Sequence, residues 1–292
     1  MSAFPASEKV LMLFIAYLHT QKISHGTIKS YLAAVRYGHI FRGLGDPKIH
    51  EMPQLEYILK GVKRSSPQCT RTRLPITPEI LMDLKKVWQR ADNRQDAKLL
   101  WAAACLCFFG FLRSGEVTMP SEVEYDQQSH LCHEDVKVDS HTAPSYIQVR
   151  LKASKTDPFR QGVELHLGAT GKELCPVAAV LSFMAVRGSS RGPLFTWRDS
   201  RFLTRDKFVK CMRAALDKAG YPADKYAGHS FRIGAATTAG KCGVPDSLIK
   251  MMGRWESTAY MCYMRTAPET LRAVSRTMVA PSKGSGQEQI LD

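Results

Sequence analysis

The chain has 292 residues, 44% of them hydrophobic, and a formal net charge of +14, so it is long enough for two domains and apolar enough to bury a core of ordinary size. A positive charge of this size favours nucleic acid over a membrane surface as the partner. The eight cysteines form no CxxC pair and no zinc-ligand spacing, and the longest apolar run is too short to span a bilayer, which argues against a disulfide scaffold, a zinc site, secretion and membrane insertion.

Two amphipathic helices are predicted at the N-terminus, from Ser7 to Thr20 and from Ser24 to Phe41, because apolar residues recur at helical spacing and a serine precedes each run. A third helix is predicted from Met52 to Val62. The stretch from Lys60 to Pro75 has five cations, no carboxylate and two prolines, and is interpreted as an exposed linker between domains. The apolar positions that recur in the first two helices are Val10, Leu11, Phe14, Leu18, Ile28, Leu32, Val35 and Ile40.

A second domain is predicted to begin where Thr77-Pro78-Glu79 caps a helix, and a long apolar helix ending near Arg113 follows. Between about His130 and Gly168 the apolar residues alternate, which predicts a small antiparallel sheet of two or three strands. The pattern then returns to helices, expected at 177–186, 204–219, 230–241, 247–252, 258–264 and 269–279, before a tail at 282–292 that is interpreted as disordered. The fold class is therefore mainly α (α+β).

Several side chains suit phosphoryl transfer, in which a protein aligns the reacting atoms and neutralises charge on the non-bridging oxygens. Arginine can grip two phosphate oxygens with one planar fork and keeps its charge. Each candidate alone is a weak signal, since surface salt bridges produce similar patterns. The ordered set is more specific: Arg113 with Glu116, then Lys155, His229 with Arg232, Trp255 and Tyr263.

This ordered set resembles that of the tyrosine recombinases, the phage integrase family, over essentially the whole chain. Four of its sequence motifs are most similar to those in the recombinases of eukaryotic DIRS-type and Ngaro-type retrotransposons and cryptons: FFGFLRSGE, SKTD, GHSFRIGAAT, and GRW followed by YMR. The resemblance implies a helical, SAM-like core-binding domain at residues 1–75, including the basic linker at 60–75, and a catalytic domain at 76–281 with a small antiparallel sheet. Family core-binding domains have a further helix before the one expected at Ser7, so an N-terminal truncation is expected.

The resemblance also implies roles. Tyr263 would attack the scissile phosphate and form a 3′-phosphotyrosyl bond, which a 5′ hydroxyl later reverses. Because a phenol is mostly protonated at neutral pH, a proton acceptor is needed, and His229 is the candidate. Lys155 would protonate the departing 5′ oxygen, while Arg113, Arg232 and the Trp255 indole would bind phosphorane oxygens. No metal or other cofactor is implied.

Several assignments have alternatives. Trp255 is equally consistent with a packing role, Glu116 with a helix salt bridge, and Arg254 with the place of the family's second histidine. Tyr260 competes with Tyr263 for the role of nucleophile, and Lys152 with Lys155 for that of acid. The sulfur-bearing residues in apolar contexts are interpreted as core, namely Cys105, Cys107, Cys262, Met251 and Met252.

Double-stranded DNA is the expected partner. The linker cations would lie along phosphates, where they add salt-sensitive affinity, and the helix from Ser24 to Phe41 would read bases through Lys29 and Arg36.

The resemblance implies a tetramer on paired sites, with the segment from Thr266 to Ala280 exchanged between neighbours, and location in the nucleus if the source is eukaryotic. The function expected is site-specific recombination or integration. The alternatives are a silent, domesticated DNA-binding copy and a type IB topoisomerase. The full set of linker and helix cations expected at DNA is Lys29, Arg36, Lys60, Lys63, Arg64, Arg71 and Arg73.

Overall fold

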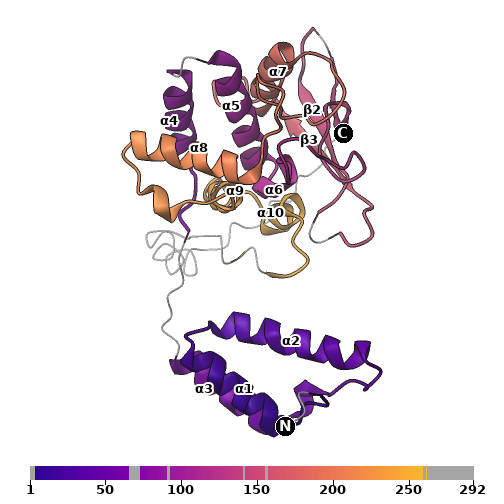
Figure 1. The fold of residues 1–292 in the computed structure, drawn as a ribbon. Coiled ribbons are helices and arrows are strands. Elements are labelled where there is room, and N and C mark those ends of the chain that lie inside the picture. The colour runs from indigo at the N-terminus through magenta and orange to yellow at the C-terminus, as the bar shows by residue number, and fades with distance from the viewer. Residues whose placement is uncertain are drawn as a thin grey trace, which may run out of the picture. The chain divides into compact units, whose positions relative to one another are not determined.

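The computed structural model describes residues 4–65, 73–90, 93–140, 142–154, 157–258 and 261. The chain divides into two compact units, Met1–Arg71 and Thr72–Asp292 (Figure 1). The described residues are mainly helical and include a small antiparallel sheet, so the predicted fold class is confirmed. Nearly all of the predicted helix at 258–264, the predicted helix at 269–279, the proposed exchange segment and the tail lie outside the described residues.

In the first unit, residues 4–65 are described and form three helices and a short 3-10 turn. Its caps are the predicted ones, since the Ser7 hydroxyl accepts a hydrogen bond from the Val10 N–H at 3.4 Å and the Ser24 hydroxyl accepts one from the Thr27 N–H at 3.2 Å. A single apolar cluster holds the helices together; its buried members are Ala6, Leu11, Ile15, Leu18, Ile28, Leu32, Leu55 and Val62. The elements are α1 (Glu8–Thr20), α2 (His25–Phe41), η1 (Ile49–Glu51) and α3 (Pro53–Ser65).

Two predictions for this unit are wrong in detail. Helix α3 continues to Ser65, so Lys60, Lys63 and Arg64 belong to a helix and not to a linker. The helix continues because Val62 extends its apolar face into the core and no proline intervenes before residue 67. Ile40 is 48% exposed, although the sequence counted it in the apolar face of an amphipathic helix.

His39 is buried beside Ile40 and accounts for that difference. Its Nε2 accepts a hydrogen bond from the Ala6 N–H at 2.8 Å, and its Nδ1 lies 2.8 Å from the Val35 carbonyl oxygen. The Phe4 ring packs on the imidazole with a centroid separation of 4.8 Å. The buried side of the last turn of α2 is therefore a histidine that binds the N-terminal segment, and Ile40 lies on the exposed side.

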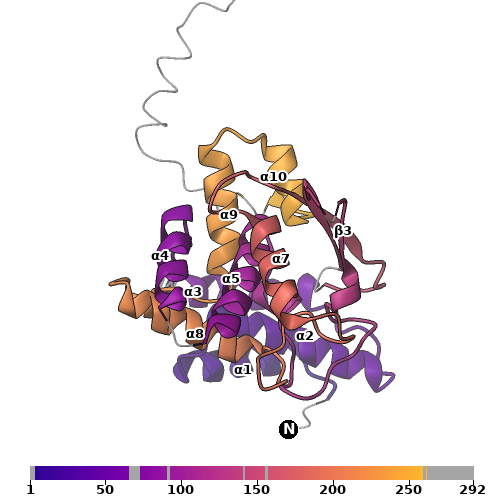
Figure 2. The ribbon, with the colours of Figure 1, turned by 90° about the horizontal axis from the view of Figure 1, so that it is seen from above.

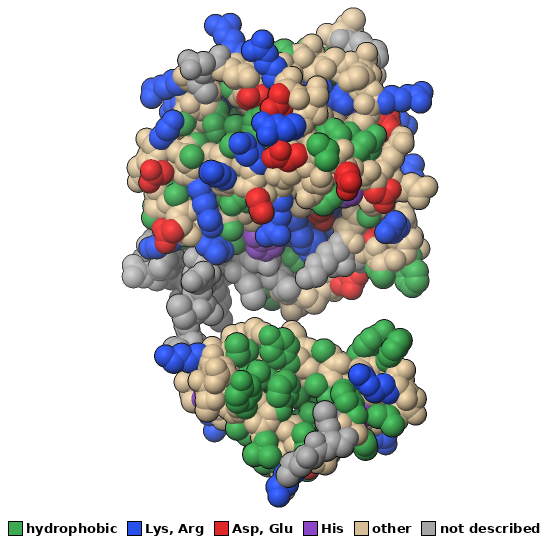
Figure 3. All heavy atoms as spheres, viewed as in Figure 1, with side chains coloured by type: hydrophobic (Ala, Val, Ile, Leu, Met, Phe, Trp, Pro, Cys, Tyr) green, Lys and Arg blue, Asp and Glu red, His purple; other side chains and the backbone are tan. Residues whose placement is uncertain are grey.

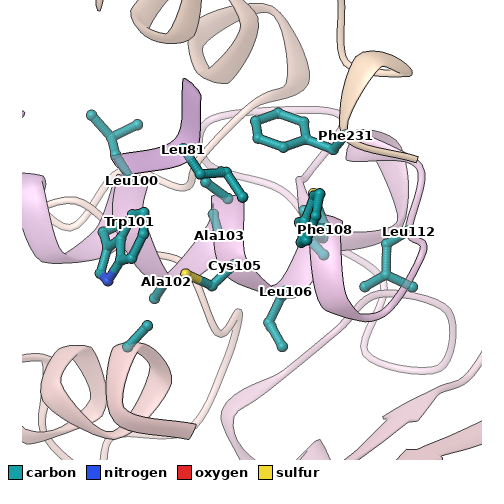
Figure 4. Close-up of a cluster of buried hydrophobic side chains, with 14 of the residues drawn as sticks. Leu81, Leu100, Trp101, Ala102, Ala103, Cys105, Leu106, Phe108, Leu112 and Phe231 are labelled. Atoms are coloured by element: carbon teal, nitrogen blue, oxygen red, sulfur yellow. The ribbon is translucent and has the colours of Figure 1, made fainter. Parts of the chain in front are cut away.

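Helix α5 (Arg94–Phe109) is the centre of the second unit, and most of its residues are buried. It packs against α4 (Pro78–Gln89), α7 (Pro176–Arg187) and α9 (Ser230–Lys241), as Figures 1 and 2 show. Figure 4 shows its side chains with Leu81 and Phe231 in the same cluster. The predicted cap of α4 is confirmed, because the Thr77 hydroxyl accepts a hydrogen bond from the Ile80 N–H.

Helix α5 ends earlier than predicted. Gly110 is its C-cap, and Phe111 adopts a left-handed backbone with φ of 52°, which stops the helix and turns the chain. Leu112 is buried, and Arg113 then opens a separate short helix, α6 (Ser114–Val117). The turn therefore separates Arg113 from the apolar helix and places it at a helix N-terminus.

The sheet has three antiparallel strands in the order β1 (Val136–Val138), β2 (Tyr146–Leu151) and β3 (Val163–Gly168). The predicted alternation is confirmed on β2, where Ile147, Val149 and Leu151 are buried. These side chains join the cluster around α5. In the register of β2 and β3, Leu151 pairs with Val163, so both strand ends that border residues 152–162 lie together.

Three of the remaining elements match predicted helices: α8 (Arg205–Lys218), α9 and α10 (Asp246–Gly253). Two 3-10 turns were not predicted, η2 (His133–Asp135) before β1 and η3 (Ala223–Lys225) after α8. The prediction of Met251 and Met252 as core is wrong, because they are 66% and 38% exposed. Helix α10 is only eight residues long and buries Ile249 and Gly253, so its methionines lie on the exposed side.

The buried thiols behave as predicted within the described residues. Cys105 and Cys107 are buried on α5, and burial raises the pKa of both thiols well above the usual value; Cys262 lies outside the described residues. No helix in the described ranges combines the length and apolarity that a bilayer crossing requires. Those ranges also contain no cluster of three or more His, Cys, Asp or Glu placed to hold a metal ion.

Lys152 anchors the end of β2. Its Nζ lies 2.6 Å from an Asp135 carboxylate oxygen, and that oxygen also accepts a hydrogen bond from the Cys132 N–H at 2.7 Å. The side chains of Lys152 and Asp135 are 16% and 8% exposed. The pair joins η2 to β2 inside the fold, where a lone charge would be costly.

Replacing Lys152 with alanine should therefore leave Asp135 as a buried carboxylate without its ion-pair partner. We expect the free energy of unfolding of the second unit to fall by roughly 3 kcal/mol, as measured by denaturant titration. The matched control is Lys137→Ala on the exposed side of β1, which should change stability by less than about 0.5 kcal/mol. Equal stabilities for the two variants would contradict this structural role of Lys152.

Candidate active site in the second unit

The short helix α6 fixes Arg113 and Glu116 relative to one another. Arg113 is its N-cap, and its backbone N–H donates to Glu116 Oε2 at 2.8 Å while its Nη1 donates to Oε1 at 3.2 Å. The side chain of Arg113 is 28% exposed and that of Glu116 only 7%. The carboxylate therefore holds both the backbone and the head group of Arg113, so Glu116 orients Arg113.

A close backbone approach brings the segment before His229 against this helix. A Cβ placed on Gly228 would lie 1.9 Å from the Ser114 hydroxyl oxygen and 2.7 Å from the Ser114 Cβ, so only glycine fits there. Gly228 precedes His229 and Ser114 follows Arg113. The two motifs, more than a hundred residues apart in the sequence, therefore meet at this contact.

Arg232 is wholly buried on the first turn of α9. Its Nη1 donates to the carbonyl of Phe111 at 3.3 Å, and its Nη2 donates to the carbonyl of Gly253. Its guanidinium carbon lies 4.2 Å from the centroid of the Trp255 ring, a cation–π contact. Arg232 thus ties the turn after α5 to the end of α10.

Trp255, for which the sequence left open a phosphate contact or a packing role, makes packing contacts in this structure. Its ring meets Phe111 edge to face at a centroid separation of 6.2 Å and lies over Arg232. It also covers Gly253, where an added Cβ would come within 1.5 Å of the indole ring. Gly253 is thus the position that lets the indole lie flat on the end of α10.

Arg254 reaches the same carboxylate as Arg113. Its Nη2 donates to Glu116 Oε2 at 2.9 Å, across 138 residues of sequence. The side chain is 13% exposed. Burial lowers the pKa of Arg254 from its usual value and the negative charge of Glu116 partly offsets this, so the guanidinium stays charged at neutral pH.

His229 lies half-buried in a positive environment. Burial lowers the pKa of its imidazole below 6.5, the positive charges of Arg232 and Arg113 lower it further, and Glu116 acts in the opposite direction. The imidazole is therefore neutral at pH 7. A neutral imidazole can accept a proton, which the predicted role requires.

The end of the β2–β3 hairpin borders the same region. A pocket of about 510 Å³ is lined by Ser154, Asp157, Lys250, Arg254 and Trp255, among others. Lys155 itself lies outside the described residues, but its described neighbours Ser154 and Asp157 both line this pocket. Lys152, its rival, is engaged with Asp135 as described above.

The described residues therefore bring together five of the seven predicted catalytic and supporting positions: Arg113, Glu116, His229, Arg232 and Trp255. Lys155 and Tyr263 lie outside the described residues, as does the rival nucleophile Tyr260, so their assignments stay predictions. Arg254, which the sequence offered only as an alternative, belongs to the cluster by its contact with Glu116.

The predicted DNA-binding side chains of the first unit are mostly exposed. Lys29 and Arg36 line a groove of about 540 Å³ between α2 and α3. Arg36 is engaged with Asp46 through a two-pronged ion pair, its closest atoms 2.5 Å apart, which lowers the pKa of Asp46 to about 2. Lys60 pairs with Glu56 at 2.7 Å, and Lys63 and Arg64 are exposed on α3.

Arg71 lies outside the described residues, and Arg73 belongs to the second unit. The Arg73 Nη1 donates to the Asp224 carbonyl oxygen at 2.7 Å, and its side chain lines a pocket of about 660 Å³ that borders Gly228. Three cations of α8 line this pocket too, and sequence reasoning missed them. Their helical spacing was the available signal: Arg205, Lys210 and Arg213.

The charge on the drawn face of the second unit is mixed. Figure 3 shows Lys and Arg side chains spread over it, with carboxylates between them. Because the cations are not gathered into one uninterrupted field there, local clusters are better candidates for phosphate contacts than the face as a whole. The pocket beside Gly228 is one of them, because its four cations outnumber the two carboxylates that also line it, Asp206 and Asp217.

No protein-family model and no curated protein matches the chain. Solved structures do match it. The XerH site-specific recombinase bound to a palindromic difH substrate aligns with a TM-score of 0.64 at 15% identity, over 95% of this chain and 74% of that one. The Tn1549 transposon integrase in complex with circular intermediate DNA aligns with a TM-score of 0.57 at 12% identity, over 93% and 85%. XerA recombinase aligns with a TM-score of 0.51 at 17% identity, over 94% and 100%.

At these identities the likeness shows the fold. The mainly helical second unit, with its three-stranded sheet, has the fold of a tyrosine recombinase catalytic domain. The resemblance inferred from the motifs is thus confirmed at the level of the fold. The affiliation with DIRS-type elements and cryptons stays a prediction.

The contact between Gly228 and Ser114 gives a direct test of how the two motifs meet. Gly228→Ala forces a methyl group into the Ser114 side chain, and we expect a loss of about 1–3 kcal/mol in the free energy of unfolding. Ser114→Gly in the same chain should recover part of that loss. Gly115→Ala, whose added methyl meets nothing within 4 Å, is the control, and a cost as large as that of Gly228→Ala would show that the contact is not the cause.

The electrostatic account of His229 predicts opposite shifts for two neighbours. Removing the negative charge with Glu116→Gln should lower the pKa of His229 further, whereas Arg113→Gln should raise it toward 6.5. Histidine ring resonances followed by NMR against pH would measure both. Because the folded-state pKa is depressed, the neutral ring stabilises the fold above pH 6.5, and that contribution is lost as the pH falls through the depressed value. A shift of the same sign in both variants would refute the account.

Proposed function

We propose that the chain is a site-specific DNA recombinase or integrase that cuts and rejoins strands through a covalent 3′-phosphotyrosyl intermediate. The observation that carries the proposal is the convergence of Arg113 and His229 at the Gly228–Ser114 contact, with Arg232 on the first turn of α9, inside a fold of the tyrosine recombinase type. Separate surface salt bridges would not require the two motifs to meet. The solved structures of similar fold include complexes with DNA.

In the proposed reaction the phenolic oxygen of Tyr263 attacks the scissile phosphorus, and the bond from phosphorus to the 5′ oxygen breaks. The phenolic proton passes to His229, whose lowered pKa keeps its ring neutral and able to accept it. Lys155 gives a proton to the departing 5′ oxygen. The reverse sequence, with a 5′ hydroxyl from another strand, rejoins the DNA and releases the tyrosine.

The arginines would neutralise charge on the phosphorane. Arg113 is partly exposed and is held by Glu116, so it is placed to bind a phosphate oxygen. Arg232 is wholly buried. Its role as a clamp therefore requires its covering to move when DNA binds.

The cations around the site would bind the flanking DNA backbone. Arg73, Arg205, Lys210 and Arg213 share the pocket that borders Gly228, next to His229. Phosphate contacts of this kind fix register and affinity and lose strength steeply with salt. The exposed cations of the first unit would add further contacts of the same kind.

The origin and assembly belong to the same proposal. The motif wording supports descent from a mobile element of the DIRS, Ngaro or crypton kind. Work as a tetramer on paired DNA sites and location in the nucleus follow from that resemblance. A genomic neighbourhood with split or inverted repeats and a reverse transcriptase gene would support this origin.

One assay addresses enzyme class and nucleophile together. The full chain is incubated with nicked or suicide duplexes, and a protein–DNA adduct that survives denaturation is sought by gel shift. We expect the adduct to be lost in Tyr263→Phe and kept in Tyr260→Phe, because only the nucleophile's oxygen is required. Lys155→Ala should lower adduct formation without lowering the free energy of unfolding, in contrast to Lys152→Ala.

The outcomes separate the rival functions. No adduct on any DNA, with binding intact, would favour a silent DNA-binding copy. Adducts with relaxation of supercoiled DNA by the chain acting alone, and no strand exchange between paired sites, would favour a topoisomerase. Loss of the adduct in Tyr260→Phe alone would move the nucleophile to Tyr260.

A further inference from the structure

Arg254 occupies an unusual place in the backbone. It follows α10 as its C-cap with φ of 53° and ψ of 49°, the left-handed conformation that residues other than glycine seldom adopt. Its N–H donates to the Met251 carbonyl at 3.0 Å, which fixes the turn. The turn sends Trp255 onto Arg232 and Gly253, whereas Arg254 reaches Glu116. Neighbouring residues thus have separate tasks.

One carboxylate serves two arginines here. Glu116 Oε1 accepts from Arg113 Nη1 at 3.2 Å, and Oε2 accepts from Arg254 Nη2 at 2.9 Å. Their guanidinium groups therefore lie on either side of the same group. Two positive charges against one negative charge leave this cluster with a net positive charge, which suits an anionic ligand.

Arg254 has donors that this arrangement does not use. Its Nε and Nη1 are buried and have no hydrogen-bond partner among the described residues. Leaving buried donors of a charged group unsatisfied costs about 1–3 kcal/mol or more, so such a group calls for an explanation. The same side chain lines the pocket of about 510 Å³ beside the hairpin end, together with Lys250 and with Ser154 and Asp157 on either side of residues 155–156.

The acidic groups of that pocket do not satisfy Arg254. Asp157 accepts hydrogen bonds from the backbone N–H groups of Gln161 at 3.1 Å and Gly162 at 2.8 Å, so it caps the hairpin loop. Glu256 lines the pocket and is exposed. Neither makes an ion pair with Arg254, whose carboxylate partner among the described residues is Glu116.

We propose that Arg254 is a third phosphate-binding arginine of the site, which donates from Nε or Nη1 to a non-bridging oxygen of the scissile phosphate. Because both atoms are buried, their covering must move when DNA binds, as it must for Arg232. In this arrangement Trp255 is a positioning residue that packs on Arg232. The third phosphate contact, which the sequence analysis assigned to Trp255, is assigned to Arg254 instead. Glu116 sets Arg113 and Arg254 at a fixed separation. The inference rests on the proposed strand-transfer function and names a further catalytic residue for it.

The kinetic test uses the full chain and the duplexes on which the wild type forms an adduct. Arg254→Gln should slow single-turnover adduct formation by about 10²–10³-fold, with DNA affinity and unfolding midpoint little changed. Trp255→Phe keeps an aromatic ring on Arg232 and should slow it by less than about tenfold. Arg201→Gln, which removes an exposed arginine paired with Asp199 and Glu122, is the control for loss of charge and should match the wild type.

A substrate with a neutral scissile phosphate distinguishes phosphate binding by Arg254 from a purely structural role of its side chain. When a methyl group replaces one non-bridging oxygen at the scissile position, the charge that Arg254 would neutralise is absent. The gap between Arg254→Gln and the wild type should therefore shrink at least about tenfold. A defect that is unchanged on the neutral substrate and accompanied by a lower unfolding midpoint would show that Arg254 only supports Glu116, and a wild-type rate in Arg254→Gln would likewise overturn the inference.

A direct binding measurement tests anion binding by Arg254 independently of the strand-transfer activity. Inorganic phosphate is titrated into the ¹⁵N-labelled chain, and the arginine Nε–H resonances are followed, with Arg254→Gln used to assign the signal. A saturable shift of the Arg254 resonance supports an anion site, and its absence overturns one. If the wild type forms no adduct on any DNA, strand transfer fails, and the titration alone decides whether Arg254 binds an anion.

Discussion

The carboxylate of Glu116 is the group on which the arrangement of the site depends. It is almost wholly buried on α6 and accepts hydrogen bonds from the backbone and head group of Arg113 and from Arg254. Without its negative charge, two guanidinium groups would be drawn into a poorly solvated region with nothing to offset their repulsion or their loss of hydration. Arg232 is stabilised in another way, by backbone carbonyls and by the face of the Trp255 ring. The fold can therefore gather three cations in the site because Arg113 and Arg254 share the Glu116 carboxylate and Arg232 is compensated separately.

The second constraint is steric. The cations converge only because two glycine backbones lie closer to a neighbouring side chain than a Cβ would allow, at Gly228 against Ser114 and at Gly253 beneath Trp255. The first contact joins the segment before α9 to α6, and the second lets the indole cover the end of α10 while its neighbour turns toward Glu116. Electrostatic compensation makes the cluster tolerable, and these two glycines determine where it forms. Neither effect alone would produce the arrangement.

Much of this was open to prediction, and the parts that were not share a physical cause. The serine and threonine caps, the apolar alternation of β2 and the helices from residue 176 to 253 follow from local patterns that act over a few residues. The length of α3 and the exposure of Ile40, Met251 and Met252 depend on which face of a helix meets the rest of its unit. The role of Arg254 depends on a partner 138 residues away. An ordered motif told us which residues belong together, but contact with a shared carboxylate is a property of the folded chain and leaves no periodic trace in the sequence.

Burial lowers the pKa of His229, and the positive charges of Arg232 and Arg113 lower it further. This positive environment bears on both halves of the proposed chemistry. It helps to keep the imidazole neutral, ready to accept a proton, and it favours a phosphate whose charge increases in the transition state. The same environment leaves part of its hydrogen-bonding capacity unused, since Arg254 holds buried donors for which the described residues provide no acceptor. A site that stores unfavourable electrostatics in this way has its best complement in an anion that brings oxygen acceptors and negative charge together. Binding of a phosphodiester and stabilisation of the second unit are then two consequences of the same interactions, because a ligand that satisfies these donors binds the folded state and not the unfolded chain.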